Sequence, residues 1–90
     1  MSPEPFGIPI EGELDLHSFE PRDVASVVEE YVHAAARSGL QIIRIVHGRG
    51  RGVQRGIVQA TLEGHPKVLE FWDDTGAYLG ATIAKLSLNL

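Results

Sequence analysis

Cysteine is absent from this chain of 90 residues. Its absence excludes a disulfide framework and thiolate chemistry. Long apolar runs are absent too, since none approaches the roughly 18 residues that a membrane-spanning helix needs. Residues 1–5 lack the basic and apolar regions of a signal peptide. We therefore expect one small domain with a single two-layer core, located in the cytoplasm and without a membrane partner.

Acidic residues are missing from the middle of the chain. No Asp or Glu occurs between residues 31 and 62, although the whole chain has a net charge of −4. The arginines of this window are Arg37, Arg44, Arg49, Arg51 and Arg55. A negative net charge disfavours general affinity for nucleic acid, whereas a basic segment on an acidic body is compatible with a weak or structure-selective phosphate binder. A solvated arginine cluster on an ordinary acidic domain is the alternative.

Hydrophobic periodicity predicts the element order β-α-β-α-β-β. The predicted strands cover residues 14–17, 41–46, 67–72 and 80–86, the predicted helices 21–38 and about 53–63, and a turn covers 73–76. Pro21 suits the first position of a helix, and Gly39 suits the residue that ends one. Residues 1–10 contain three prolines and are expected to form a loose arm, so that the domain proper covers residues 11–90.

Two histidines stand at the ends of the first two predicted strands. A strand–helix–strand unit of this length makes a right-handed crossover with parallel strands. If those strands are neighbours, about 4.8 Å apart, then His17 and His47 lie at the same edge of the sheet. Two imidazoles at one edge could exchange protons near neutral pH. The alternative is that each histidine caps a helix or bonds a loop carbonyl.

The segment between the second strand and the second helix alternates glycine with arginine, as Gly48-Arg49-Gly50-Arg51-Gly52. Open α/β sheets bind ligands at such strand ends, and the free N–H groups of a helix N-terminus attract anions. The arginines of this loop and Arg55 could hold phosphate oxygens bidentately. The segment matches neither a P-loop nor the dinucleotide-binding fingerprint. A loop that simply faces solvent is the alternative.

Asp15 precedes His17 by two residues, so the two side chains share one face of a strand. Asp15 could orient His17, act as a base, or bind a divalent metal, for which Mg²⁺ or Mn²⁺ is the candidate cofactor. A carboxylate bonded to backbone amides is the structural alternative. The remaining histidines, His33 within a helix and His65 before a proline, are predicted to be solvated.

Two short signatures, Leu14-Asp15-Leu16-His17 and His47-Gly48-Arg49-Gly50, resemble those of the Smr (small MutS-related) domain family. The resemblance covers about residues 13–86. It implies an α/β fold, an α+β two-layer sandwich similar to the C-terminal domain of translation initiation factor 3. The implied sheet is mixed and four-stranded, in the order 1-2-4-3. The chain departs from the family at Ser18, where a glycine is usual, and before the last strand, where a glycine-rich turn is reduced to Gly80.

The resemblance also implies a function, because family members include DNA-nicking and RNA-cleaving endonucleases. Carried over by position, the catalytic candidates are Asp15, His17, His47 and Arg49, and the nucleic-acid-binding candidates are Gly48, Gly50, Arg51, Gly52 and Arg55. The two histidines would act as general acid and base, and Arg49 would stabilise the transition state. A non-catalytic nucleic-acid-binding or adaptor module, or a module for a protein partner, is the alternative. The chain is expected to be a free-standing, monomeric domain.

Overall fold

The computed structural model describes residues 9–50, 52–76 and 80–88. Its elements are β1 (Gly12–Asp15), α1 (Pro21–Arg37), β2 (Ile42–Val46), α2 (Val53–Glu63), β3 (Val68–Asp73) and β4 (Ala81–Leu86). The predicted element order is thereby confirmed. The first strand ends two residues earlier than predicted, so that His17 lies in the turn that follows it. Most of the predicted arm (residues 1–8), Arg51 and residues 77–79 lie outside the described part of the chain.

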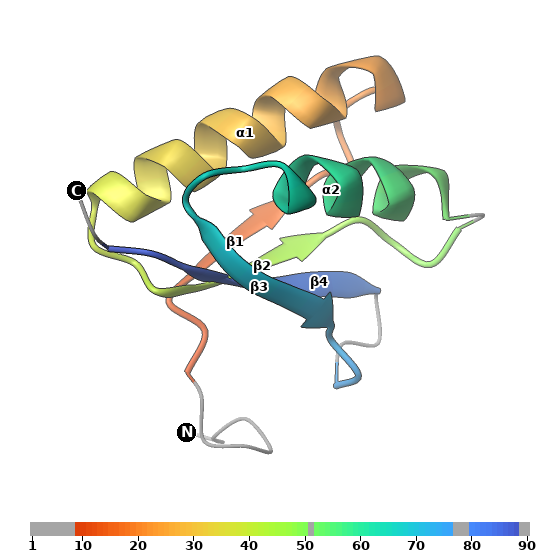
Figure 1. Cartoon of the computed structure of the whole chain (residues 1–90). Helices are drawn as coiled ribbons and strands as arrows, with labels where there is room; N and C mark the ends of the chain where they lie inside the picture. The colour runs from red at the N-terminus through yellow and green to blue at the C-terminus, as the bar shows by residue number, and fades with distance from the viewer. Residues whose placement is uncertain (1–8, 51, 77–79, 89–90) are drawn as a thin grey trace.

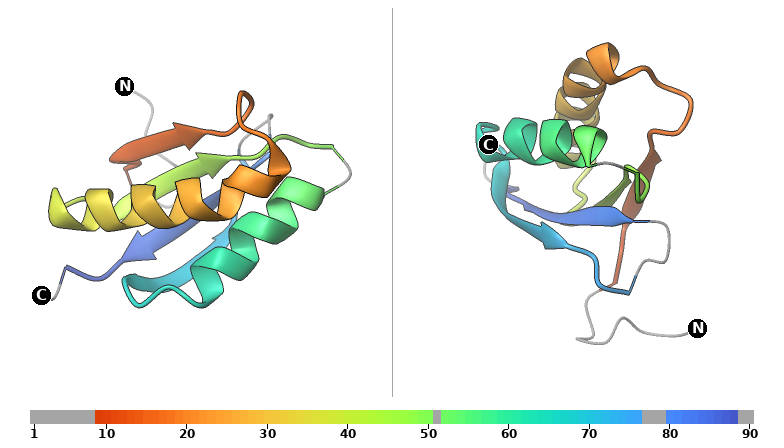
Figure 2. Two further views of the ribbon diagram at one scale, coloured as in Figure 1. Left: turned by 90° about the horizontal axis from the view of Figure 1, so that it is seen from above. Right: turned by 90° about the vertical axis from the view of Figure 1, so that its right-hand side faces the viewer.

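The four strands form one mixed sheet in the order β1-β2-β4-β3, which is the implied order. β1 and β2 are parallel, with Leu14 opposite Ile45, and β4 runs antiparallel to both β2 and β3. Both helices cover the same face of this sheet, which gives the two expected layers (Figure 1). The N-termini of the two helices lie at the same end of the molecule (Figure 2). That end also holds the carboxyl ends of β1 and β2.

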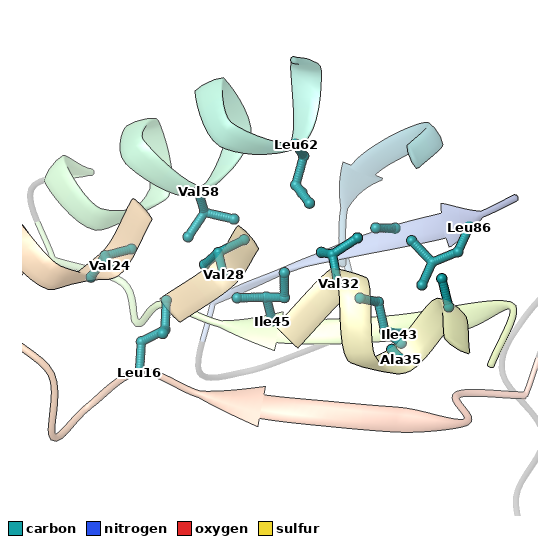
Figure 3. Packing of buried hydrophobic residues seen from close by; sticks show 12 residues of the cluster. Leu16, Val24, Val28, Val32, Ala35, Ile43, Ile45, Val58, Leu62 and Leu86 are labelled. Carbon is teal, nitrogen blue, oxygen red and sulfur yellow. The ribbon is translucent and has the colours of Figure 1, made fainter. Parts of the chain in front are cut away.

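The core fills the space between the helices and the sheet (Figure 3). Alternation along β2 points Ile43 and Ile45 toward the helices, and both side chains are fully buried. The residues packed around them come from both helices, from β4 and from the position directly after β1: Leu16, Val24, Val28, Val32, Val58, Leu62 and Leu86. In the part of the chain that the structure describes, no helix is both long and apolar enough to cross a membrane.

The boundaries of α1 follow from its end signals. Pro21 occupies the first turn, where its missing N–H costs no hydrogen bond. Glu20 stands at the N-cap without a side-chain capping bond, so the helix start depends on Pro21 and on core packing. At the other end Gly39 takes a φ of +85°, the left-handed conformation predicted for it.

One local prediction is wrong, and another is confirmed only in part. His65 is only 8% exposed, and its Nδ1 accepts a hydrogen bond from the Lys67 N–H at 3.0 Å, so it closes the connection between α2 and β3. The predicted turn at residues 73–76 is shorter than expected, because Asp73 is the last residue of β3 and the turn covers residues 75–76, after the buried Asp74. The burial of Asp74 follows from no local pattern, because its partner Arg44 lies 30 residues away in the chain. His33 is exposed, as predicted.

Candidate functional site

The loop after β2 is held by the backbone of the residue that precedes β4. The N–H groups of His47 and Gly48 both donate to the carbonyl oxygen of Gly80, at 3.2 and 3.1 Å. A Cβ on Gly80 would lie 2.5 Å from the carbonyl oxygen of Gly48, and Gly80 has a φ of +79°. Only glycine fits there without strain. The single glycine that the chain keeps from the family's glycine-rich turn therefore still makes a close backbone approach.

The loop leads directly into the N-terminus of α2. Gly52 is its N-cap residue in the left-handed conformation, with a φ of +86°. Among the residues that the structure describes, no side-chain hydrogen bond caps this helix end, and its first turn carries no acidic residue. The first N–H groups of a helix have no partner within the helix, and they carry the positive end of its dipole. This helix end is therefore of the kind that binds anions.

An open hollow of about 230 Å³ lies beside the loop and the helix end. It gathers most of the residues predicted for the site: His47, Gly48, Arg49, Gly50, Gly52 and Arg55. Asp73 and Asp74 also line it, although the sequence assigned them to a turn. The hollow therefore combines a basic loop with two carboxylates that the sequence did not place there.

Arg49 is an exposed cation at this hollow. Within the described ranges it makes no hydrogen bond or ion pair with another residue. Its guanidinium is therefore not held by a carboxylate among those residues, and it can reach an anion in solvent. Arg51, predicted to act beside it, lies outside the described residues.

Arg55, predicted to clamp phosphate, is instead bound to a carboxylate. Its Nε and Nη2 donate to the two oxygens of Asp73 at 2.8 and 2.7 Å, which is a bidentate ion pair. The hydrogen bond from Arg55 is the main reason that the pKa of Asp73 lies below its ordinary value, and the same bond raises the pKa of Arg55. A phosphate would have to compete with Asp73 for this arginine.

His47 sits at the inner edge of the hollow with both ring nitrogens engaged. Its Nδ1 lies 3.0 Å from the carbonyl oxygen of Gly48, and its Nε2 lies 2.9 Å from the hydroxyl oxygen of Thr82. Thr82 is fully buried, and its hydroxyl oxygen also accepts a hydrogen bond from the side-chain amide of Gln59. Gln59 also donates to Asp73. Sequence reasoning missed Thr82 and Gln59; the inward alternation of β4 and the spacing of four between Arg55 and Gln59 were the only signals.

Asp15 and His17 form a separate pair outside this hollow. The backbone N–H of His17 donates to Oδ1 of Asp15 at 2.9 Å, and the ring Nδ1 lies 3.1 Å from the same oxygen. The backbone hydrogen bond is the largest cause of the lowered pKa of Asp15. Both side chains are exposed. The geometry agrees with the hypothesis that Asp15 orients His17.

The turn that carries His17 is tied to both the sheet edge and α2. Leu16 donates to the carbonyl oxygen of Val46 at 3.0 Å, directly before His47. The side chain of Gln54, in the first turn of α2, donates to the carbonyl oxygen of Phe19 at 3.4 Å. The turn therefore lies at the same edge as the loop, although no hydrogen bond joins the two histidines within the described ranges.

A metal site is not preformed at Asp15. Among residues 9–50, 52–76 and 80–88, no group of three or more His, Asp or Glu side chains could hold a metal ion. Oδ1 of Asp15 is already engaged by His17. Mg²⁺ commonly uses one or two carboxylates together with substrate oxygens and water. Asp15 would supply one such carboxylate, and the remaining ligands would have to come from substrate and water.

The family model for the Smr domain matches residues 14–87, nearly the whole domain. The chain belongs to the Smr domain family. Its fold is similar to the crystal structure of the Smr domain of Thermus thermophilus MutS2, with a TM-score of 0.76 and 26% identity. That match covers 83% of this chain and 96% of the other.

Curated relatives of this Smr domain carry the name Endonuclease MutS2. The protein of Thermomicrobium roseum is 32% identical over 88% of this chain, and that of Caldicellulosiruptor saccharolyticus is 35% identical over 81%. A Clostridium botulinum protein (strain Loch Maree / Type A3) is 36% identical over 66%. The matched regions make up only 8–10% of the length of these relatives.

Proposed function

We propose that this Smr domain is a nucleic-acid endonuclease that binds a phosphate of DNA or structured RNA in the hollow beside α2. One observation carries the proposal. An uncapped helix N-terminus, a glycine-containing loop and the exposed Arg49 converge on the same open hollow. We also propose that the domain acts as a monomer in the cytoplasm, which sedimentation and cell fractionation test.

Phosphate binding would use the backbone more than the side chains. The absence of side chains at Gly48 and Gly50 lets a phosphate oxygen approach the loop closely. The N–H groups of the first turn of α2 would donate to that oxygen. Arg49 would add a charge-assisted bond, whereas Arg55 would join only if the phosphate displaced Asp73.

Proton transfer would fall to Asp15 and His17. With Nδ1 of His17 donating to Asp15, Nε2 is left to take a proton from the attacking hydroxyl or water, or to return one to the leaving oxygen. Arg49 would stabilise the negative charge that develops on the phosphorus-bound oxygens. The turn that carries His17 is tied to α2 through Gln54, which supports a shared site. His47 is the second proton carrier that the sequence predicts.

A cleavage assay tests this proposal. The purified domain is incubated with labelled branched DNA and structured RNA, with added Mg²⁺ or Mn²⁺ and with EDTA. We expect cleavage by the wild type and a loss of about 10²-fold or more in His17→Ala, because general acid–base catalysis supplies that much. His33→Ala, which removes another exposed histidine from α1, is the matched control and should cleave normally. Equal cleavage by wild type and His17→Ala would reject the assignment.

A non-catalytic nucleic-acid-binding module is the second candidate function. The ion pairs of Arg55 with Asp73 and of Arg44 with Asp74 favour it, since they neutralise part of the basic segment. Such a module would bind nucleic acid weakly, with strong salt dependence. Binding without cleavage under any metal condition would support this candidate over the endonuclease. A protein partner whose binding is insensitive to Arg49→Ala would instead indicate an adaptor.

A further inference from the structure

A chain of hydrogen bonds runs behind the loop, from His47 to the surface. It passes from the His47 ring to Thr82 on β4, to Gln59 on α2, to Asp73 at the end of β3, and ends at Arg55. We propose that Thr82 and Gln59 are positioning residues that hold His47 as the neutral Nδ1–H tautomer with both nitrogens engaged. His17, and not His47, is then the proton carrier of the proposed endonuclease. The mechanistic half of this inference depends on the proposed function.

At the loop end of this chain of hydrogen bonds, the contact with Gly48 determines whether Nδ1 of His47 carries a hydrogen. Nδ1 of His47 lies 3.0 Å from the carbonyl oxygen of Gly48. A carbonyl oxygen can only accept a hydrogen bond. Nδ1 must therefore carry a hydrogen, and the neutral ring then has a lone pair at Nε2.

The surface end of the hydrogen-bond chain is compatible with the same tautomer. Asp73 is ionised beside Arg55 and can only accept, so the group of Gln59 that faces it is the amide NH₂. The second hydrogen of that amide points to Thr82, at 3.1 Å. The Thr82 hydroxyl thus accepts from Gln59, and its own hydrogen is free to go to Nε2 of His47 at 2.9 Å.

Because Thr82 is buried, breaking this arrangement of hydrogen bonds is costly. Thr82 is 0% exposed, so solvent water does not compete for its hydroxyl. A buried donor or acceptor left without a partner costs about 1–3 kcal/mol. Among these groups, the hydroxyl hydrogen of Thr82 has an acceptor only when Nε2 of His47 carries no proton. His47 would have to leave at least one of these bonds to act as an acid or base.

In this arrangement His47 fixes the conformation of the loop after β2. Its ring links the buried face of β4 to the carbonyl oxygen of Gly48, while Gly80 holds the N–H groups of the same two residues. The loop is therefore fixed from both its donor and its acceptor sides. A phosphate site made of backbone groups requires such fixation, because misplacement by about 1 Å can cost 10²-fold in rate.

Long-range proton–nitrogen correlation NMR of the full chain tests the tautomer and does not depend on cleavage activity. Two-bond correlations from ring carbon-bound protons to both ring nitrogens should show His47 as the Nδ1–H form. Thr82→Val should move the Nε2 resonance of His47, because the hydroxyl donor is lost, and Thr82→Ser should restore it. An Nε2–H form in the wild type, or ring resonances that Thr82→Val leaves unchanged, would overturn the inference.

Cleavage kinetics test the mechanistic half. Thr82→Val should lower the cleavage rate by up to about 10²-fold without moving the pH midpoint of the rate profile, and Thr82→Ser should recover most of it. His47→Asn keeps a donor where Nδ1 stands, and it should lose no more activity than Thr82→Val. A loss as complete as that of His17→Ala would make His47 a proton carrier and overturn the inference. If the wild type does not cleave, the endonuclease proposal fails, and NMR still decides the tautomer.

Discussion

Gly80→Ala offers the sharpest test of how the loop after β2 is built. The added methyl carbon would lie 2.5 Å from the carbonyl oxygen of Gly48 and 2.8 Å from its carbonyl carbon. Ordinary contact begins near 3.4 Å, so either the loop or the β4 end must move by 3.4 minus 2.5, or 0.9 Å. The obstacle is backbone, which cannot rotate away as a side chain does. We therefore expect the hydrogen bonds from His47 and Gly48 to Gly80 to be weakened or lost.

The expected cost has two parts. An alanine in the left-handed conformation costs about 1–2 kcal/mol. Loss of the two backbone hydrogen bonds adds about 0.5–1.5 kcal/mol each. Gly80→Ala should therefore destabilise the domain by about 2–5 kcal/mol, by adding these ranges.

Gly39→Ala is the matched control. Gly39 has a φ of +85°, close to that of Gly80, but a methyl group there meets nothing within 4 Å among the described residues. It should cost only the conformational part, about 1–2 kcal/mol. Urea unfolding of both variants gives the two free energies, and the amide resonances of His47 and Gly48 show whether the loop has moved. Equal costs for the two variants, with unmoved loop amides, would refute the close approach.

Two further predictions concern charge. Arg49→Ala should weaken nucleic-acid binding and should reduce, by about one, the slope of log binding constant against log salt concentration. Arg37→Ala, at the far end of α1, should leave this slope unchanged. Equal slopes for the wild type and Arg49→Ala would contradict the phosphate contact. Asp73→Asn should be less stable than the wild type near neutral pH. Because pairing with Arg55 lowers the pKa of Asp73, its contribution is fully present above the ordinary value of 3.8 and is lost as the pH falls below it. The stability difference between the two proteins should therefore shrink below about pH 4, and urea midpoints that keep a constant gap from pH 7 to pH 3 would contradict the ion pair.

Local sequence signals were sufficient for most of the architecture. Periodic valines, Pro21 and Gly39 predicted α1, and the apolar run at β2 predicted a strand between two helices. The paired signatures around His17 and His47 then indicated the family and its strand order. These inferences hold because helix ends, alternation and crossover handedness depend on residues close together in the chain.

Partners distant in the chain were not predictable in the same way. The sequence shows Thr82 only as one residue of a β-branched strand. The contacts of His47 with Thr82 and of Arg55 with Asp73 span 35 and 18 residues. They exist because β3 and β4 pair antiparallel and set Asp73 opposite Thr82 beneath α2.

The amino-acid sequence by itself determined the order of the elements, the place of the glycine–arginine loop before α2, and the family. Each follows from side-chain spacing and turn chemistry within a short stretch of chain. Only the tertiary structure decided which charges and ring nitrogens remain available to a ligand. Arg49 reaches solvent whereas Arg55 meets Asp73, and His17 is exposed whereas His47 is held on both sides. The reason is that a hydrogen bond or an ion pair depends on distance in space, which strand register and helix packing set.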